Sequence, residues 1–172
     1  MARHLVSESR PVPTAAEWRA AMGAFPTGVT VVTSWAGDAP VGSTINAFCS
    51  VSLDPPMLLI CLDLANPIRP AVEASGVFGV NFLAEENGQA AARHFAIDPE
   101  TDRFAAYGYT AASGGAPWLD IAPVFVDCAV ENILVAGDHI VVVGRGLRVE
   151  HTPEAQPLLY HRGRFPKLRS EP

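Results

Sequence analysis

Short apolar segments rich in β-branched residues, each flanked by a turn-forming pair, constrain this chain most strongly. The segment GVTVVTSW at residues 28–35 is followed by Gly37-Asp38, and the segment at residues 139–149 is preceded by Gly137-Asp138. Gly-Asp pairs suit tight hairpin turns because glycine adopts positive φ angles without steric cost. The pattern predicts antiparallel strands at residues 28–35, 41–48, 57–62, 77–82, 124–131 and 139–149.

Three helices are predicted, one before the first strand and two between strands. Residues 14–17 (TAAE) have the spacing of a capping box, so a short amphipathic helix begins there and ends near residues 23–26. Asn66-Pro67 suits the cap and first position of a second helix, and residues 84–95 read as a third. Residues 99–117 are rich in Gly, Ala and Ser and are predicted to be irregular. Many short strands with few helices predict a mainly β fold with helices, an antiparallel barrel.

Length and composition limit the number of domains and the class of partner. The chain has 172 residues, of which 49% are hydrophobic and 17% are charged, enough for one buried core and too few for two. We therefore expect one domain at residues 14–168, preceded by a flexible arm at residues 1–13. The formal net charge of −6 argues against nucleic acid as a partner, because phosphate-backbone binding requires clustered Lys and Arg.

The hydrophobic runs are short and the cysteines are few. Residues 57–62 form one of the longest apolar runs, far below the roughly 20 residues that a membrane-spanning helix needs. No secretory leader opens the chain, so we expect no membrane partner and a cytoplasmic location. Three cysteines without metal-ligand spacing suggest neither a disulfide framework nor a metal site. We expect Cys49, Cys61 and Cys128 to be reduced and buried.

A block of small polar residues lies within residues 42–62 (GSTINAFCSVSLDPPMLLICL), between two apolar segments. Its Ser, Thr and Asn side chains can satisfy their own backbone at the end of a strand. Alternatively, their hydroxyl groups and the backbone N–H groups can converge on an anion or on a planar, hydrogen-bonding ring. Taken alone, the block leaves both interpretations open.

Two further stretches have both a structural and a functional interpretation. His139, after the Gly-Asp turn, is either part of a hairpin or a side chain held over the mouth of a pocket. Residues 158–165 (LLYHRGRF) are either an edge strand with a basic face or part of a binding site. The sequence has no Gly-x-Gly-x-x-Gly, Walker-type or Gly-x-Ser-x-Gly motif, and its carboxylates form no convincing acid/base pair.

Three blocks of the sequence form a recognisable combination. The blocks are Trp18-Arg19-x-x-Met22-Gly23-x-Phe25-x-Thr27-Gly28-Val29-Thr30-Val31-Val32-Thr33, Gly42-x-Thr44-x-Asn46-Ala47-Phe48-x-Ser50-Val51-Ser52-Leu53-x-Pro55-Pro56 and Gly137-Asp138-His139. Taken together, they resemble the short-chain flavin reductase family, the NAD(P)H:flavin oxidoreductase components of two-component flavin-dependent monooxygenases. The resemblance extends over roughly residues 15–168, and the blocks occur in the family's order.

The resemblance implies an FMN-binding split-barrel fold, a homodimer and reduction of free FMN or FAD by NADH or NADPH, with NADH favoured. It also implies that the reduced flavin passes to a partner monooxygenase. The implied flavin-binding residues are Thr27, Gly28, Val29, Thr30, Ser43, Thr44, Ile45, Asn46 and Ala47 at the ring, and Ser50, Val51, Ser52, Arg93, His94 and Phe95 near the phosphate. The implied nicotinamide contacts are His139 and Phe165.

The implied reaction requires no acid or base from the protein. Hydride transfer from nicotinamide C4 to flavin N5 needs the two rings stacked at about 3–3.5 Å. Backbone N–H groups of residues 43–47 are suited to stabilise the negative charge that develops around flavin N1 and the C2 carbonyl. His139 would position the nicotinamide. Phe165 stands where relatives often have tyrosine, so only packing or stacking remains for it.

Two other functions on the same fold stay open. A non-catalytic flavin-binding protein would use the polar block without a nicotinamide site, and the presence of Gly137-Asp138-His139 argues against it. An enzyme resembling pyridoxamine-phosphate oxidase would need a basic cluster for its substrate phosphate. Arg162, Arg164 and Lys167 are the residues that favour this second alternative.

Overall fold

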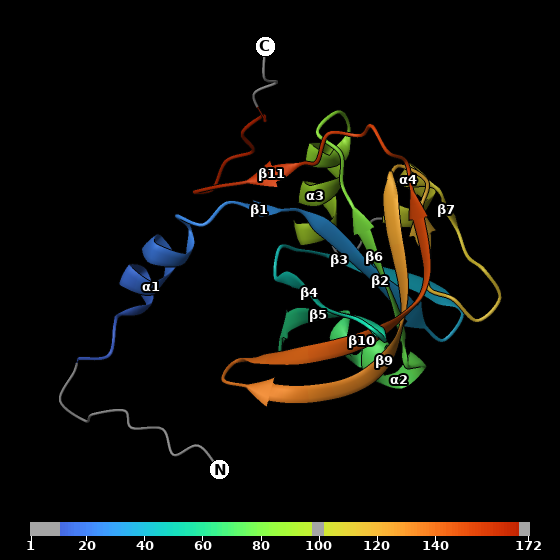
Figure 1. Ribbon diagram of the computed structural model, residues 1–172, viewed down its shortest axis with the longest axis horizontal. Coiled ribbons are helices and arrows are strands. Elements are labelled where there is room, and N and C mark those ends of the chain that lie inside the picture. Colours follow the sequence, from blue (N-terminus) through green and yellow to red (C-terminus); the bar gives the residue numbers. More distant parts are fainter. Residues whose placement is uncertain (1–10, 98–101, 169–172) are drawn as a thin grey trace.

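The computed structural model describes residues 11–97 and 102–168. A curled β-sheet forms its body, with α2 at one end, α3 and α4 at the other, and α1 standing apart (Figure 1). In chain order the elements are α1 (Ala15–Met22), β1 (Thr27–Gly28), β2 (Thr30–Ala36), β3 (Ala39–Ile45), β4 (Phe48–Leu53), β5 (Pro56–Asp63), α2 (Arg69–Ser75), β6 (Val77–Phe82), α3 (Gly88–Ile97), α4 (Arg103–Tyr107), β7 (Tyr109–Thr110), β8 (Trp118–Leu119), β9 (Val124–Ala136), β10 (His139–His151) and β11 (Leu159–Tyr160).

Seven strands form the main sheet in the order β3-β2-β6-β9-β10-β5-β4, and every pair is antiparallel. The chain passes from one edge strand, β3, to the other, β4, through Asn46 and Ala47. Because no ladder joins these two described strands, the barrel is split between them. The prediction of a mainly β, antiparallel split barrel with few helices is confirmed.

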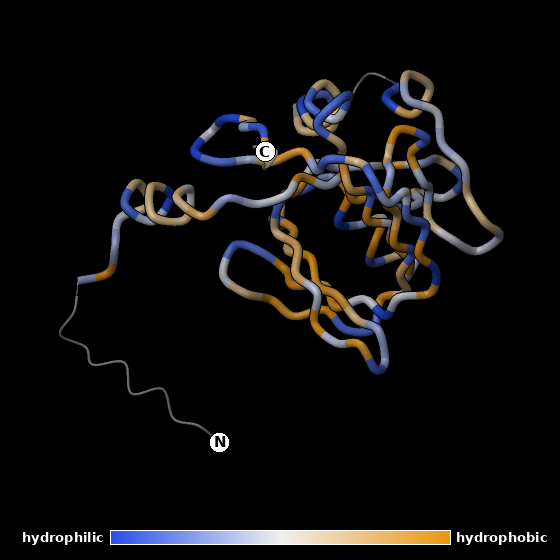
Figure 2. The backbone as a smooth tube through the Cα atoms, turned by 45° about the horizontal axis from the view of Figure 1, so that its top comes forward, coloured by the Kyte–Doolittle hydropathy of each residue, from blue (hydrophilic) through white to orange (hydrophobic). Residues whose placement is uncertain are grey.

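Alternation along the strands produces two hydrophobic cores. On β2, Val32 points into the barrel and Val31 points toward α3, because successive side chains of a strand face opposite sides. The barrel core also contains the fully buried Phe78 from β6, and the second core contains Phe95 from α3. In Figure 2 the most hydrophobic backbone segments lie mainly in the strands of this body. The two cores hold the helices against opposite sides of the sheet.

The predicted hairpins and the first helix are present. Gly37 and Gly137 have φ angles of 63° and 65°, and they lie in the turns that connect β2 to β3 and β9 to β10. Thr14 and Glu17 form the predicted capping box. Pro11 to Pro13 are exposed and outside regular structure, and the rest of the predicted arm, residues 1–10, lies outside the described residues. No helix within the described ranges is long and apolar enough to cross a membrane.

Half of the polar block forms a strand that was not predicted, β4. Ser50 and Ser52 belong to β4, which pairs with β5 and has a bulge between them. An edge strand leaves one side open to solvent, so it tolerates polar side chains that a central strand would not. Cys49 is exposed on the same strand, so the expectation of three buried cysteines is also wrong; Cys128 is buried and Cys61 is intermediate.

Two segments outside the main sheet also differ from the prediction. The second helix begins at Arg69, because the Asn66 side chain accepts a hydrogen bond from the Ile68 N–H (3.1 Å) in a turn before it. The region predicted to be irregular contains α4 and β7, and β8 begins directly after it. Asp102 caps α4 by accepting a hydrogen bond from the Ala105 N–H (2.9 Å), a start signal that the surrounding Ala and Gly residues obscured.

Gly144→Ala is expected to lower the free energy of unfolding by about 2–3 kcal/mol, because overpacking a core has costs of this size. Gly144 is buried on β10, where an added Cβ would overlap the ring of Phe78 and lie 3.0 Å from Cβ of Cys128. Gly146→Ala, two residues along the same strand, is the matched control, since its Cβ would meet Pro56 at ordinary contact distances of 3.6–3.8 Å. Urea denaturation of both variants checks the difference, and equal losses would contradict this packing.

A buried carboxylate gives the fold a pH dependence. Asp127 on β9 is 4% exposed and accepts a hydrogen bond from the Ala116 N–H (3.1 Å), which fixes the loop before β8. Burial raises the pKa of this carboxyl, although the hydrogen bonds from Ala116 and Cys128 and the charge of Arg148 oppose the increase. The folded protein therefore retains a proton that the unfolded chain releases, and stability is lost as the pH rises through the folded pKa.

Asp127→Asn removes this titration and keeps an oxygen acceptor for Ala116. The variant should therefore gain stability relative to the unmodified protein as the pH rises from about 3 to about 7. Urea denaturation across that range measures the gap, with Asp38→Asn on an exposed turn as the control for removal of one negative charge. A stability gap that does not change with pH would show that Asp127 ionises equally in the folded and unfolded states.

Candidate functional site

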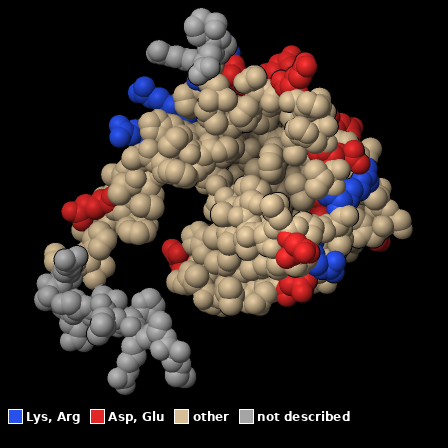
Figure 3. Space-filling view, viewed as in Figure 1, with Lys and Arg blue, Asp and Glu red and all other residues tan. Residues whose placement is uncertain are grey.

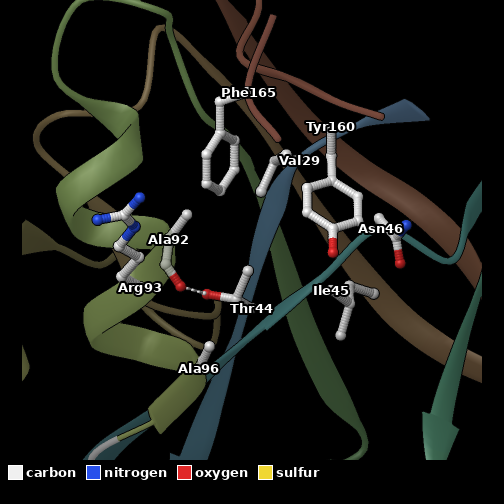
Figure 4. A pocket seen from close by; sticks show the side chains of 9 residues that line it. All are labelled: Val29, Thr44, Ile45, Asn46, Ala92, Arg93, Ala96, Tyr160 and Phe165. Carbon is white, nitrogen blue, oxygen red and sulfur yellow. Dashed lines mark hydrogen bonds between the residues drawn. The ribbon is translucent and has the colours of Figure 1, made fainter. Parts of the chain in front are cut away.

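A pocket of about 260 Å³ lies between α3, β3 and the C-terminal segment (Figure 4). Its floor comes from β3, one wall comes from α3 and the opposite wall comes from two aromatic rings. The described residues that line it are mostly apolar and include no carboxylate. The lining residues are Val29, Thr44, Ile45, Asn46, Ala92, Arg93, Ala96, Tyr160 and Phe165.

One hydrogen bond and one close packing contact hold α3 against β3. The Thr44 hydroxyl donates to the Ala92 carbonyl oxygen (2.7 Å), so this side chain joins the floor of the pocket to its wall. Two residues earlier on β3, Gly42 lets the Phe95 ring approach, since an added Cβ would lie 2.9 Å from that ring. Ala92 and Ala96 lie four residues apart and present small side chains to the pocket, which leaves the space beside the helix open.

The aromatic wall depends on a tight turn in the C-terminal segment. Tyr160 on β11 pairs with Thr27 on β1, and the chain then reverses through Arg162 and Gly163, which have φ angles of 49° and 76°. This turn returns Phe165 to the same side, so its ring lies 5.6 Å from the Tyr160 ring. The backbone N–H of Arg162 donates to the Gly23 carbonyl (3.2 Å), which connects the turn to the end of α1.

A second pocket, of about 380 Å³, adjoins the first and shares Val29 and Asn46 with it. It contains the rest of the predicted segment Thr27 to Thr30. The Asn46 amide donates to the Thr27 hydroxyl (3.2 Å), which connects the two predicted flavin segments. The structure therefore brings both segments to the wall between two neighbouring pockets.

The predicted phosphate residues on β4 lie further along the barrel. Ser50 and Ser52 line a third, strongly apolar pocket, which adjoins the second through Phe48. Val51 is 51% exposed. Ser43 is buried, and its hydroxyl accepts a hydrogen bond from the Asn66 amide (3.1 Å), so this hydroxyl serves the fold.

Of the three predicted residues on α3, Arg93 alone lines the aromatic-walled pocket. Its guanidinium carbon lies 5.9 Å from the centroid of the Phe165 ring, within the range of a cation–π contact. The Phe95 ring is buried in the second core and meets Phe104 edge to face at 5.4 Å. His94 lies against Tyr107, with ring centroids 5.7 Å apart. The structure does not bring Phe95 or His94 to the pocket.

His139 lies outside the pockets described above, at the start of β10. Its partner across the ladder is Asp63, two residues beyond Cys61, whose N–H donates to the Ala47 carbonyl (3.0 Å). His139 and the segment at Ala47 are therefore at the same end of the sheet, on opposite sides of β5. His139 Nδ1 is 2.8 Å from Asp138 Oδ1, and this hydrogen bond lowers the pKa of the Asp138 carboxyl.

Three pocket residues were not among the predicted site residues: Tyr160, Ala92 and Ala96. The spacing of Ala92 and Ala96 around Arg93 is a helical signal, because residues four apart share a face. Tyr160 lies in the stretch LLYHRGRF, where the resemblance pointed to Phe165 alone. The stretch contains strand β11, and the tyrosine ring lines the pocket.

The surface around the pocket is unevenly charged. In Figure 3, Lys and Arg side chains gather over the C-terminal segment, beside a hollow that carries few charged side chains. Arg162 and Arg164 are exposed in this segment. In a chain with a net charge of −6, these two guanidinium groups bring local positive charge to this segment.

The split barrel and its aromatic-walled pocket define a protein that is suited to bind a planar heteroaromatic ligand. Residues 22–169 match the family described as "Flavin reductase like domain". The chain therefore belongs to the flavin reductase-like family, and the resemblance noted from the sequence is confirmed.

Individual relatives agree with this assignment. The chain is 37% identical over 148 residues to the flavin-dependent monooxygenase reductase subunit HsaB of Rhodococcus jostii, covering 86% of this chain and 75% of that protein. It is 36% identical over 151 residues to an NADH-dependent FAD reductase of Streptomyces globisporus, covering 86% and 82%. The solved structure of the NADH:FAD oxidoreductase SgcE6 from S. globisporus matches with a TM-score of 0.84 and 33% identity, covering 94% of this chain and 100% of that one.

Proposed function

We propose that this protein catalyses the reduction of free FMN or FAD by NAD(P)H, with NADH favoured. The observation that carries the proposal is the aromatic-walled pocket next to Thr27–Thr30 and Ile45–Asn46, within a chain of the flavin reductase-like family. Relatives named an NADH-dependent FAD reductase and an NADH-dependent FMN reductase support both flavins and favour NADH. The continuous family match at residues 22–169 also supports a single domain at residues 14–168.

The chemistry of the bound pair is hydride transfer from nicotinamide C4 to flavin N5. The protein supplies position and polarity to it. Val29 and Ile45 give the pocket an apolar surface for a flat ring, and Arg93 beside Phe165 supplies positive charge. The segment 43–47 supplies backbone dipoles, which stabilise developing charge without rearranging.

The remaining site assignments belong to the same proposal. His139 would position the nicotinamide nucleotide, supported by its place at the Ala47 end of the sheet. Ser50 to Ser52 would approach the flavin phosphate, supported by the continuity of the second and third pockets through Phe48. The positive charge of the C-terminal segment would attract the phosphates of either nucleotide.

The reduced flavin would then pass to a partner monooxygenase in the cytoplasm. Relatives named as reductase subunits of flavin-dependent monooxygenases and of a stachydrine N-demethylase support a separate oxygenase component. A solved relative is the flavin reductase component of a two-component tryptophan halogenase, with a TM-score of 0.83 and 35% identity. The free cysteines agree with a reducing compartment.

A homodimer is the proposed assembly, because large apolar side chains lack cover within the described chain. Helix α1 projects from the barrel (Figure 1) and has no buried residue. Its Trp18 and Met22 are 57% and 53% exposed, and Leu53 and Val149 on the barrel are 92% and 62% exposed. A second copy would cover these surfaces. Sedimentation equilibrium should therefore give a mass near 37 kDa, twice the 18.3 kDa of one chain, and a mass of one chain would contradict it.

The activity is tested by following NADH or NADPH oxidation at 340 nm with FMN or FAD as acceptor. Turnover that depends on both the protein and added flavin is expected, and it should be fastest with NADH. A protein that binds flavin without oxidising either nicotinamide would be a flavin carrier. Absence of both binding and turnover in all four pairs would overturn the proposal.

A further inference from the structure

The hydroxyl of Tyr160 is a polar group inside the aromatic-walled pocket. Figure 4 shows its hydroxyl pointing into the pocket toward the floor that Thr44 and Ile45 form. The side of the ring packs against Phe165 at a centroid distance of 5.6 Å. The backbone of Tyr160 pairs with Thr27, so the ring has a fixed base on β11.

Of the other polar side chains in the pocket, Thr44 and Asn46 are hydrogen-bonded within the fold, and Arg93 lies against the Phe165 ring. The Thr44 hydroxyl donates to Ala92, and the Asn46 amide donates to Thr27. Within the described part of the chain, the Tyr160 hydroxyl has no hydrogen-bond partner. A phenol both donates and accepts a hydrogen bond, so it can serve the carbonyl oxygens and ring nitrogens of a heteroaromatic ligand.

The shape of the pocket determines which part of a ligand reaches this hydroxyl. Ala92 and Ala96 form one wall and Tyr160 and Phe165 lie across from it, so the space between them suits a flat ring. Aromatic walls favour stacked or edge-on contact with such a ring. The hydroxyl at the edge of the wall is then placed to meet a polar edge of the ring.

We propose that Tyr160 is a flavin-binding residue whose hydroxyl hydrogen-bonds to the isoalloxazine ring and fixes its orientation in the pocket. This inference rests on the proposed function, because it takes flavin as the ligand of the pocket. Stacking and apolar contact alone would allow a ring to slide or turn in its plane. A single directional hydrogen bond from a tyrosine that is anchored through β11 removes that freedom.

The test compares Tyr160→Phe with Tyr109→Phe. Both changes delete one phenol oxygen, and the two side chains have similar exposure, at 37% and 38%. Tyr109 packs against Trp35 and Phe104, away from the pocket, so it is a matched control. Quenching of FMN or FAD fluorescence measures the dissociation constant without requiring turnover.

Tyr160→Phe should weaken flavin binding roughly three- to ten-fold, the range expected for one neutral hydrogen bond. Tyr109→Phe should change it by less than about two-fold, and both variants should keep the thermal midpoint of the unmodified protein. If Tyr160→Phe binds flavin as tightly as the unmodified protein, the role of Tyr160 is refuted while the proposed function stands. If the unmodified protein binds no flavin, the proposed function fails and the role of Tyr160 fails with it.

Discussion

Ala96→Phe should weaken flavin binding by at least about 100-fold while leaving the protein folded. Ala96 lines the pocket from α3, and a phenyl ring there would occupy the space opposite the aromatic wall. Excluding a flat ring from about 120 Å² of apolar contact, at roughly 25 cal/mol per Å², costs about 3 kcal/mol. This free energy corresponds to about two orders of magnitude in the dissociation constant.

The same substitution at Ala90 is the control. Ala90 is exposed on α3 and lies outside the aromatic-walled pocket, so Ala90→Phe carries the same cost in helix propensity. Its flavin affinity should stay within about two-fold of the unmodified protein, since exposed substitutions away from a site have small effects. If Ala96→Phe binds flavin with unchanged affinity, the ligand does not enter this pocket.

Asn81→Leu should lower the free energy of unfolding by about 3–5 kcal/mol, because it deletes the centre of a buried hydrogen-bond network. Asn81 is fully buried on β6, and its amide donates to the Val31 carbonyl (3.0 Å) and to the Thr33 hydroxyl (3.1 Å). Its side-chain oxygen accepts from the Leu119 N–H (2.8 Å). Leucine is similar in size but offers no polar atom to these three groups.

Chemical denaturation with urea measures the loss. Asn132→Leu on β9 is the comparison, since Asn132 is exposed and should tolerate the same change within about 0.5 kcal/mol. A loss at residue 81 no larger than at residue 132 would show that β8 is held by its apolar contacts alone. The network matters for the fold because it attaches Leu119 to the second core.

The strands and their turns could be predicted because their signals are local. Gly37 and Gly137 have the positive φ angles that the Gly-Asp pairs predicted, and the alternation on β2 reproduces the division between the two cores. The edge strand β4 was missed because its polar side chains are acceptable only on an open edge, which depends on strand order. Strand order is a property of the whole sheet, and no local pattern contains it.

The candidate site could be predicted only in part, because some of its residues are brought together by pairing between distant strands. Thr27 to Thr30 and Asn46 were identified through the resemblance, and the structure brings them to two adjoining pockets. Tyr160 was missed because its place depends on pairing with Thr27, more than a hundred residues earlier, and on the turn that returns Phe165. Phe95 shows the opposite case: a residue placed near the ligand by resemblance has its ring in the core.

The most direct test of the account is anaerobic mixing of the protein with FAD and NADH, followed at 450 nm. The account predicts that flavin absorbance falls far faster with the protein present than with NADH alone. It also predicts that Ala96→Phe abolishes most of this acceleration, whereas Ala90→Phe preserves it. Flavin bleaching no faster than the protein-free reaction, or equal rates in the two variants, would contradict the claim that flavin is bound and reduced in the pocket between β3, α3 and β11.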